Sequence, residues 1–221
     1  MATLPLSAAE QKRVLELMSQ QTLRMRTLVN DLLTLAQLEG SPRPTVDRWT
    51  ALRPLIGQVE LDAQALSGGR HAVSVDPAPA VQIAGAEAEL TSAVSNLVSN
   101  AIRYTPEGGK VEVRSTMTAD GGLEIAVSDS GIGIAREHIA RLTERFYRVD
   151  GSRSRETGGT GLGLSIVKHV VQRHGGTLEI HSEPGRGSTF RIVLPAGRIR
   201  AVEGSGEEAP VSRVLSLIHI S

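Results

Sequence analysis

The sequence of 221 residues contains no cysteine, which excludes disulfide bonds, thiolate metal sites and thiol nucleophiles. It also lacks a surplus of charge, because 24 lysines and arginines balance 24 aspartates and glutamates. No broad basic field therefore indicates binding to nucleic acid or to an anionic membrane. No apolar run approaches the ~20 residues that a membrane-spanning helix needs, and no signal peptide is visible. We expect this part of the protein to lie in the cytoplasm.

What is present is the composition of a globular protein, with 40% hydrophobic residues. The length suffices for one full domain and a smaller piece. We predict a long helix within residues 1–40, a domain over residues 45–197 and a disordered tail over residues 198–221. The last seven residues, LSLIHIS, resemble a translated transposase-adapter sequence and are interpreted as an artefact. A natural amphipathic tail is the alternative.

The predicted first helix carries an apolar seam. Ser7 and Glu10 have the spacing of a capping box, which satisfies free backbone N–H groups at a helix start, and Gly40 and Pro42 end the helix. Apolar residues recur at heptad spacing, so the helix needs partners, most simply in a four-helix bundle. A surface helix lying on its own domain is the alternative. The seam consists of Val14, Met18, Met25, Leu28, Leu32 and Leu35.

After Trp49 the chain alternates between helical and strand periods. Strands outnumber crossover helices and often pair as hairpins, for instance around Asp120, Gly121 and Gly122. This pattern predicts an α+β fold, a two-layer α/β sandwich whose mixed sheet carries helices on one face, and argues against a doubly wound fold. The predicted helices are 52–66, 86–104 and 162–174; the predicted strands are 71–75, 81–83, 110–116, 123–127, 177–181 and 189–194.

The first of four motifs with chemical potential lies on the helix 86–104. Asn96 and Asn100 are one turn apart, opposite the apolar stripe, and Arg103 and Tyr104 extend the same face. Amide oxygens suit a hard cation such as Mg²⁺, and an arginine suits phosphate. Two solvated asparagines are the alternative interpretation.

The second motif, DSGIGI, directly follows a strand. Asp129 can accept a hydrogen bond from the exocyclic amine of adenine, whereas guanine presents a carbonyl there, so the site would select ATP over GTP. Gly131 and Gly133 allow the backbone to approach a flat ligand closely. A glycine turn capped by aspartate is the alternative.

The third motif, GGTGLGL, opens the helix 162–174. Backbone N–H groups and glycines at a helix start form an anion site suited to phosphates. The fourth motif lies between the second and third and is long, basic and glycine-flanked, which favours a disordered segment or a lid. Phe146 and Tyr147 would anchor such a lid to the domain or to the bundle, and Arg148, Arg153 or Arg155 would reach phosphate.

The order of these four motifs resembles that of the ATP-binding domain of bacterial sensor histidine kinases, in the superfamily that includes DNA gyrase B, Hsp90 and MutL. The resemblance covers about residues 4–196. The first helix is similar to the second helix of the dimerisation and phosphotransfer hairpin, which implies that the first hairpin helix is missing. Residues 95–109 and 137–171 resemble in particular the sensor kinases of the phosphate regulon.

Carried over residue by residue, the resemblance implies that Asn100 is the Mg²⁺ ligand, that Asn96 lies beside it, and that Asp129 accepts from the adenine amine. The other implied roles fall into three sets: Arg103 and Tyr104 border the phosphates and ribose; Gly131, Gly133 and Ile134 shape the adenine pocket; Gly159, Thr160, Gly161, Leu162, Gly163 and Leu164 form the phosphate end and the hinge of the lid.

The acceptor histidine of such kinases has no counterpart, because none of the six histidines lies in the expected context; they are His71, His138, His169, His174, His181 and His219. The resemblance therefore implies a fragment that cannot autophosphorylate. It would transfer the γ-phosphate of ATP to a histidine of another chain and on to an aspartate of a response regulator of the phosphate-regulon type. The whole protein would be a homodimer through its hairpin helices, anchored in the bacterial inner membrane by upstream segments.

Two rival functions are an ATP hydrolase of the same superfamily and a non-catalytic ATP-binding dimerisation module. The hydrolases use a glutamate as general base one turn before the Mg²⁺ ligand. Asn96 stands at that position and cannot accept a proton at neutral pH. The complete set of glycines, Asp129 and both asparagines argue against a degenerate module.

Overall fold

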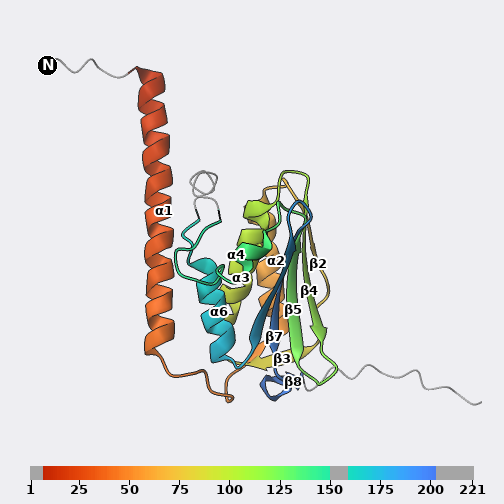
Figure 1. Cartoon of the computed structure of the whole chain (residues 1–221). Coiled ribbons are helices and arrows are strands. Elements are labelled where there is room, and N and C mark those ends of the chain that lie inside the picture. The colour runs from red at the N-terminus through yellow and green to blue at the C-terminus, as the bar shows by residue number, and fades with distance from the viewer. Residues whose placement is uncertain (1–6, 150–158, 203–221) are drawn as a thin grey trace, which may run out of the picture.

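A computed structural model of the chain describes residues 7–149 and 159–202. A long helix, α1 (Ala8–Gly40), lies beside a two-layer domain in which three helices cover one face of a five-stranded sheet (Figure 1). The predicted α+β class and layer arrangement are therefore confirmed. No described helix is both long enough and apolar enough to cross a membrane.

The five-stranded sheet is mixed. β2 runs parallel to β4, and the remaining neighbours pair antiparallel in the order β2-β4-β5-β7-β6. Along β4 and β5 every second side chain is buried, because successive side chains point to opposite faces and one face meets the helices. The strands are β2 (Ala72–Val75), β4 (Lys110–Met117), β5 (Leu123–Asp129), β6 (Thr177–Glu183) and β7 (Gly187–Leu194).

The covering helices are α2 (Leu52–Ser67), α3 (Glu87–Tyr104) and α6 (Gly163–Arg173), with a short helix α4 (Arg136–Ile139) beside them. Each of the three long helices buries one apolar stripe, as its 3.6-residue period predicts. Leu52, Leu97 and Ile166 are among the most deeply buried side chains. Burying a side chain of this size contributes about 1.5–3 kcal/mol, so the layer contact supplies much of the domain's stability.

A second, three-stranded antiparallel sheet lies at the lower end of the domain in Figure 1. The sequence predicted only one of its strands, at residues 81–83. This sheet contains β1 (Trp49–Ala51), β3 (Val81–Ala84) and β8 (Ile199–Ala201), in the order β1-β3-β8. β1 and β8 are three residues long, too short for a period to be read. β8 lies beyond residue 197, where the sequence interpretation ended the domain, and it is a strand because β3 pairs with it. The predicted tail from residue 203 onward, LSLIHIS included, lies outside the described residues.

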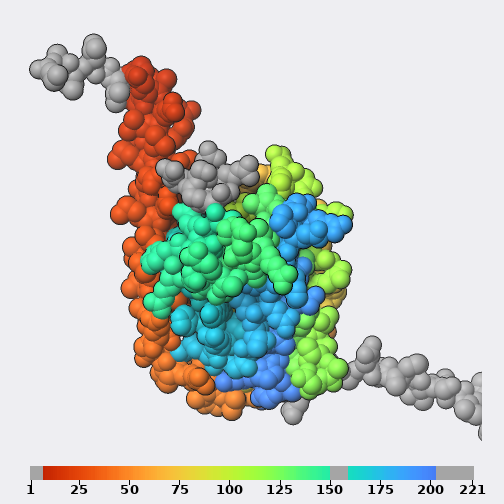
Figure 2. Space-filling view, viewed as in Figure 1, coloured from red at the N-terminus to blue at the C-terminus, as the bar shows by residue number. Residues whose placement is uncertain are grey.

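Helix α1 has two different halves. The predicted capping box is present: Ser7 Oγ accepts from the Glu10 N–H, and the Ser7 N–H donates to Glu10 Oε2. Leu35 and Leu38 are buried where α1 meets α6. The amino-terminal part of the helix projects beyond the domain (Figure 2) and exposes the seam residues Val14, Met18 and Met25. The prediction that other helices cover this seam stays a prediction.

Arg173, in the last turn of α6, attaches α1 to the domain. Its guanidinium donates to both carboxylate oxygens of Glu89, at 3.1 and 3.0 Å. It also donates to three carbonyl oxygens at the end of α1 and in the following linker, those of Leu38, Ser41 and Pro42, at 2.6–2.8 Å. Terminal carbonyls of a helix have no partner within the helix, so Arg173 satisfies groups that α1 leaves open.

We expect Arg173→Ala to lower the free energy of unfolding by about 2–4 kcal/mol, because Glu89 and the linker carbonyls lose a nearly buried cation. Denaturant unfolding measures this loss, and limited proteolysis should show faster cleavage between residues 41 and 48. Arg186→Ala is the matched control, since Arg186 is largely exposed and its ion pair is with Glu183 three residues earlier. Equal effects of the two substitutions would contradict the assigned role.

Candidate functional site

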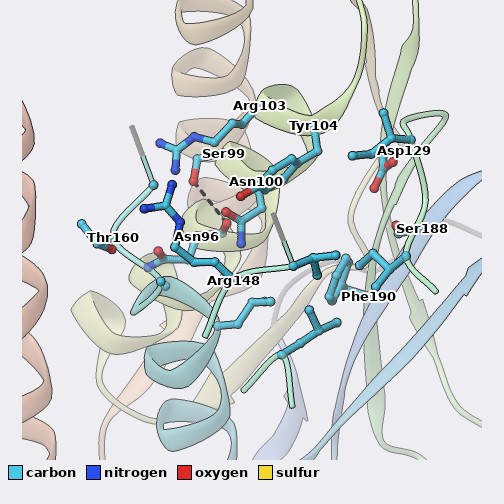
Figure 3. A pocket seen from close by; sticks show the side chains of 18 of the residues that line it. Asn96, Ser99, Asn100, Arg103, Tyr104, Asp129, Arg148, Thr160, Ser188 and Phe190 are labelled. Carbon is cyan, nitrogen blue, oxygen red and sulfur yellow. Dashed lines mark hydrogen bonds between the residues drawn. The ribbon is translucent and has the colours of Figure 1, made fainter. Parts of the chain in front are cut away.

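A cavity of about 390 Å³ lies between α3, α6, the ends of β5 and β7, and α1. Its size falls within the range of small-molecule sites. Thr160 lies near one end and Asp129 and Ser188 near the other, with the α3 side chains between them (Figure 3). The structure thus gathers residues from the four separate motifs around one space.

One wall of the cavity is the polar face of α3. Asn96, Asn100, Arg103 and Tyr104 all line it, while the opposite face of the helix, including Leu97, is buried in the core. The helix is held in this rotation because its apolar stripe must face the sheet. The polar residues therefore point into the cavity as a consequence of core packing.

The two asparagines differ in their partners. Asn96 Nδ2 donates to the Ser92 carbonyl oxygen at 2.8 Å, which directs Oδ1 toward Gly163 at the start of α6. A Cβ at Gly163 would lie 2.6 Å from Asn96 Oδ1, so only glycine lets the two elements approach this closely. Within the described part of the chain the Asn100 amide has no hydrogen-bond partner and is available to a ligand.

Asp129 ends β5 at the other end of the cavity. The backbone N–H of Gly131 donates to Asp129 Oδ1 at 2.8 Å, and the Ser188 N–H on the neighbouring strand also donates to this carboxylate. Burial raises the pKa of Asp129 above its ordinary value, and these two hydrogen bonds oppose the rise. A partly desolvated carboxylate with an open acceptor position can recognise an amine donor of a flat ligand.

The turn after Asp129 depends on glycine. Gly133 has φ = +66°, and a Cβ there would collide with the Glu183 carbonyl oxygen. The turn is also held by the Ser182 hydroxyl, which accepts from the Ile134 N–H at 2.8 Å. Ile134 and Gly133 line the cavity, whereas Gly131 contributes through its hydrogen bond to Asp129.

The glycine loop 159–163 forms the other end of the cavity. Gly159, Thr160, Gly161, Gly163 and Leu164 line it. Leu162 does not, because its side chain is fully buried in the core and fixes the start of α6. Thr160 Oγ1 donates to Asp31 Oδ2 of α1 at 2.6 Å and accepts from the Leu162 N–H at 3.3 Å.

The predicted lid is anchored to the domain by one of its two aromatic residues. The Tyr147 hydroxyl is hydrogen-bonded to His138 Nδ1 of α4 at 2.7 Å, and the Arg141 guanidinium lies 4.2 Å from the ring centroid. Tyr147 and Arg148 line the cavity. Phe146 is mostly exposed, with φ = +63°, and its N–H donates to the Gly161 carbonyl oxygen at 2.9 Å. Arg153 and Arg155 lie outside the described residues.

Several lining residues were missed by the sequence interpretation. Ser188 and Phe190 lie two apart on β7, so they share a face of the strand, but no motif marked them. Thr27 and Asp31 come from α1, which the sequence interpretation assigned only to a helical bundle. The spacing of these two polar residues, four apart on one helix face, could have indicated that this face of α1 borders a site. None of the five described histidines lines the cavity.

Comparisons with known proteins show which family the chain belongs to. The family model described as "Histidine kinase-, DNA gyrase B-, and HSP90-like ATPase" matches residues 85–198, which include α3, Asp129 and the glycine loop. The chain belongs to this family. Its relatives are sensor histidine kinases, so the resemblance found in the sequence is confirmed.

Among curated relatives, the phosphate regulon sensor protein PhoR of Pseudomonas aeruginosa is 54% identical over 192 residues, covering 86% of this chain and 43% of that protein. The sensor-like histidine kinase SenX3 of Mycolicibacterium smegmatis is 40% identical over 185 residues, covering 83% of this chain and 48% of that protein. The chain thus spans less than half the length of these relatives.

Two solved structures share the fold. The mycobacterial sensor histidine kinase MprB is 30% identical with a TM-score of 0.58, and the match covers 70% of this chain and 99% of that chain. Full-length ShkA, solved in complex with AMPPNP, is 25% identical with a TM-score of 0.67, covering 91% of this chain and 41% of that chain. The ShkA match extends over more of this chain than the MprB match does.

We expect Asp129→Asn to abolish the preference of the cavity for adenine over guanine and to leave the fold intact. The folded state binds the Asp129 proton more tightly than the unfolded state, so this group's contribution to stability is largest below its ordinary pKa and is lost as pH rises through its raised pKa. The neutral variant should be at least as stable as the wild type near pH 7. Its affinity for adenosine should fall about 10- to 100-fold.

Thermal unfolding from about pH 4 to pH 7 and adenosine titrations would test both parts of this prediction. Asp120→Asn is the control, because Asp120 is exposed in the β4–β5 turn and lies away from the cavity. Retained adenosine affinity in Asp129→Asn would contradict the assigned role.

Gly163→Ala tests the contact with Asn96. Alanine favours a helix, but the new methyl group would displace the Asn96 amide, so nucleotide affinity should fall about tenfold. Gly57→Ala is the matched control, because nothing lies within 4 Å of its Cβ position in α2. That substitution should stabilise the protein by about 0.5–1 kcal/mol and leave nucleotide binding unchanged. Isothermal titration and denaturant unfolding of both variants measure the contrast.

Proposed function

We propose that this chain is the ATP-binding catalytic part of a sensor histidine kinase of the phosphate-regulon type. The observation that carries the proposal is the convergence of the α3 polar face, Asp129 and the glycine loop on one cavity of nucleotide size. The 54% identity to PhoR of Pseudomonas aeruginosa supports the phosphate-regulon assignment. Full kinase activity belongs to the longer protein of which such a chain would be part.

In the proposed complex, adenine lies at the Asp129 end of the cavity and donates its exocyclic amine to the carboxylate. The ribose and phosphates extend along α3 past Tyr104 and Arg103. The terminal phosphate lies near Thr160 and the first turn of α6, because the first N–H groups of a helix have no partner within the helix and suit an anion. Closure of the lid over the nucleotide would bring Arg148, with Arg153 or Arg155, to the phosphates.

The donor set fits Mg²⁺ bound together with ATP. No group of three histidine, aspartate or glutamate side chains that could hold a metal ion is found in residues 7–149 and 159–202. Asn100 offers an unengaged amide oxygen on the cavity wall, and Asn96 lies one turn away. Mg²⁺ is commonly held by one or two protein oxygens together with substrate phosphates and waters. When bound, the ion would neutralise charge on the transferred phosphoryl group.

The protein's own part in phosphoryl transfer is positioning. The cavity would hold ATP so that a histidine imidazole from another chain can attack the γ-phosphate in line, since no described histidine lines the cavity. The phosphoryl group would then pass to an aspartate of a response regulator. The exposed seam of α1 would pair with other hairpin helices in a dimer, and upstream segments would anchor the full protein in the inner membrane.

The cavity favours transfer over hydrolysis. Among its described lining residues the only carboxylates are Asp31 and Asp129. Asp31 is hydrogen-bonded to Thr160 and Asp129 to Gly131, and they lie near opposite ends. Asn96 occupies the position of the general base of the related hydrolases and cannot accept a proton. The described site therefore has no carboxylate at the α3 position that the related hydrolases use to activate water.

We expect phosphoryl transfer in trans. The 221-residue chain, γ-labelled ATP with Mg²⁺ and an intact hairpin from a similar kinase should give acid-labile label on the hairpin histidine. Asp129→Asn and omission of Mg²⁺ should each remove the label. Phosphate release into solution without labelled protein would favour a hydrolase. Tight ATP binding without either product would favour the non-catalytic module.

A further inference from the structure

An unexplained feature of the cavity is a carboxylate at its phosphate end. Asp31 of α1 lines the cavity together with Thr27, one helical turn away. Its Oδ2 accepts the 2.6 Å hydrogen bond from Thr160, a residue 129 positions away in the sequence. A carboxylate oxygen and a phosphate oxygen have the same charge sign and the same acceptor chemistry, so they compete for the same donors.

The surroundings of Asp31 are those that a phosphate would need. Arg103 is close enough to favour the charged form of Asp31 electrostatically, and the Thr160 hydrogen bond acts in the same direction. Burial opposes both and raises the pKa of Asp31 above its ordinary value. The partly desolvated carboxylate thus accepts a hydrogen bond from one hydroxyl donor and lies in the field of one cation.

The placement of Asp31 depends on how α1 is docked. Leu35 and Leu38 are buried against the domain, and Arg173 holds the end of the helix through the Leu38 carbonyl oxygen. Glu39 pairs with Arg145, the residue before the lid aromatic pair, and lies 3.6 Å from His169 of α6. These contacts are confined to the carboxyl-terminal half of α1, while the other half projects from the domain (Figure 2). None of the partners named here belongs to a strand, so loss of these contacts would leave the pairing of the five-stranded sheet intact.

We propose that docked α1 is autoinhibitory, with Asp31 occupying at Thr160 and Arg103 the place of an ATP phosphate oxygen. ATP binding and α1 docking then compete, and by linkage whatever pulls α1 away raises ATP affinity while ATP weakens α1 docking by the same factor. Adenosine, which has no phosphate, does not compete with Asp31. This inference rests on the proposed binding of ATP in the cavity.

The first test is a comparison of ligands. For Asp31→Asn, isothermal titration of the 221-residue chain should give an affinity for Mg·ATP about tenfold higher than in wild type, with adenosine affinity changed less than about twofold. Glu16→Gln removes the same charge from an exposed position on the same helix and should change neither affinity. Unchanged or weakened ATP binding in Asp31→Asn would overturn the proposal. Failure of wild type and variants to bind ATP or adenosine would instead overturn the proposed function.

The second test measures docking itself and uses the absence of cysteine from the chain. A thiol introduced as Leu35→Cys lies in the α1–α6 contact and should react slowly with a thiol reagent; Mg·ATP should accelerate the reaction several-fold and adenosine should not. Leu33→Cys is the control, because Leu33 is 57% exposed and should react rapidly in all conditions. If Leu35→Cys fails to fold, Leu38→Cys replaces it. Protection of the thiol by ATP, or no change, would overturn the proposal.

Discussion

The whole arrangement depends on burial of the apolar face of α3. That face, with Leu97 at its centre, is enclosed by the sheet, α2 and α6. A helix that must bury one stripe has no freedom to rotate about its axis, so the opposite stripe is fixed as well. Asn96, Asn100 and Arg103 therefore face the start of α6 and the end of β5. Core packing and the geometry of the cavity are two consequences of one interface.

The cavity carries a desolvated carboxylate at each end, and burial raises the pKa of both. Burying a charged carboxylate lowers the stability of the folded state, so the presence of each of these groups points to a role in function. Asp129 is held by backbone N–H groups of the domain and belongs to it whether or not α1 is present. Asp31 reaches the cavity only through the docked helix. One charge is thus a permanent part of the pocket, whereas the other depends on the position of α1.

The two halves of helix α1 have different surroundings. Its carboxyl-terminal half packs on α6, with Arg173 satisfying its terminal carbonyls. The remaining half exposes a heptad seam with no partner among the described residues, which suits association with other helices. Movement imposed on the free half would be transmitted to Asp31 because a helix is stiff over this distance. The same α6 ends at Arg173 and begins at the glycine-loop end of the cavity.

The sequence alone determined most element types, the layer arrangement and the four motifs whose residues line the cavity. Helical and strand periods, caps and motif spacings are set by residues close together in the chain. The capping box at Ser7 and the paired face of Asn96 and Asn100 are of this kind. Only the tertiary structure decided the β1-β3-β8 sheet, the backbone N–H of Ser188 beside Asp129, and the contact of Asp31 with Thr160. These features depend on segments far apart in the sequence that burial of the core brings together. No local pattern predicts which distant residue will lie next to a given side chain.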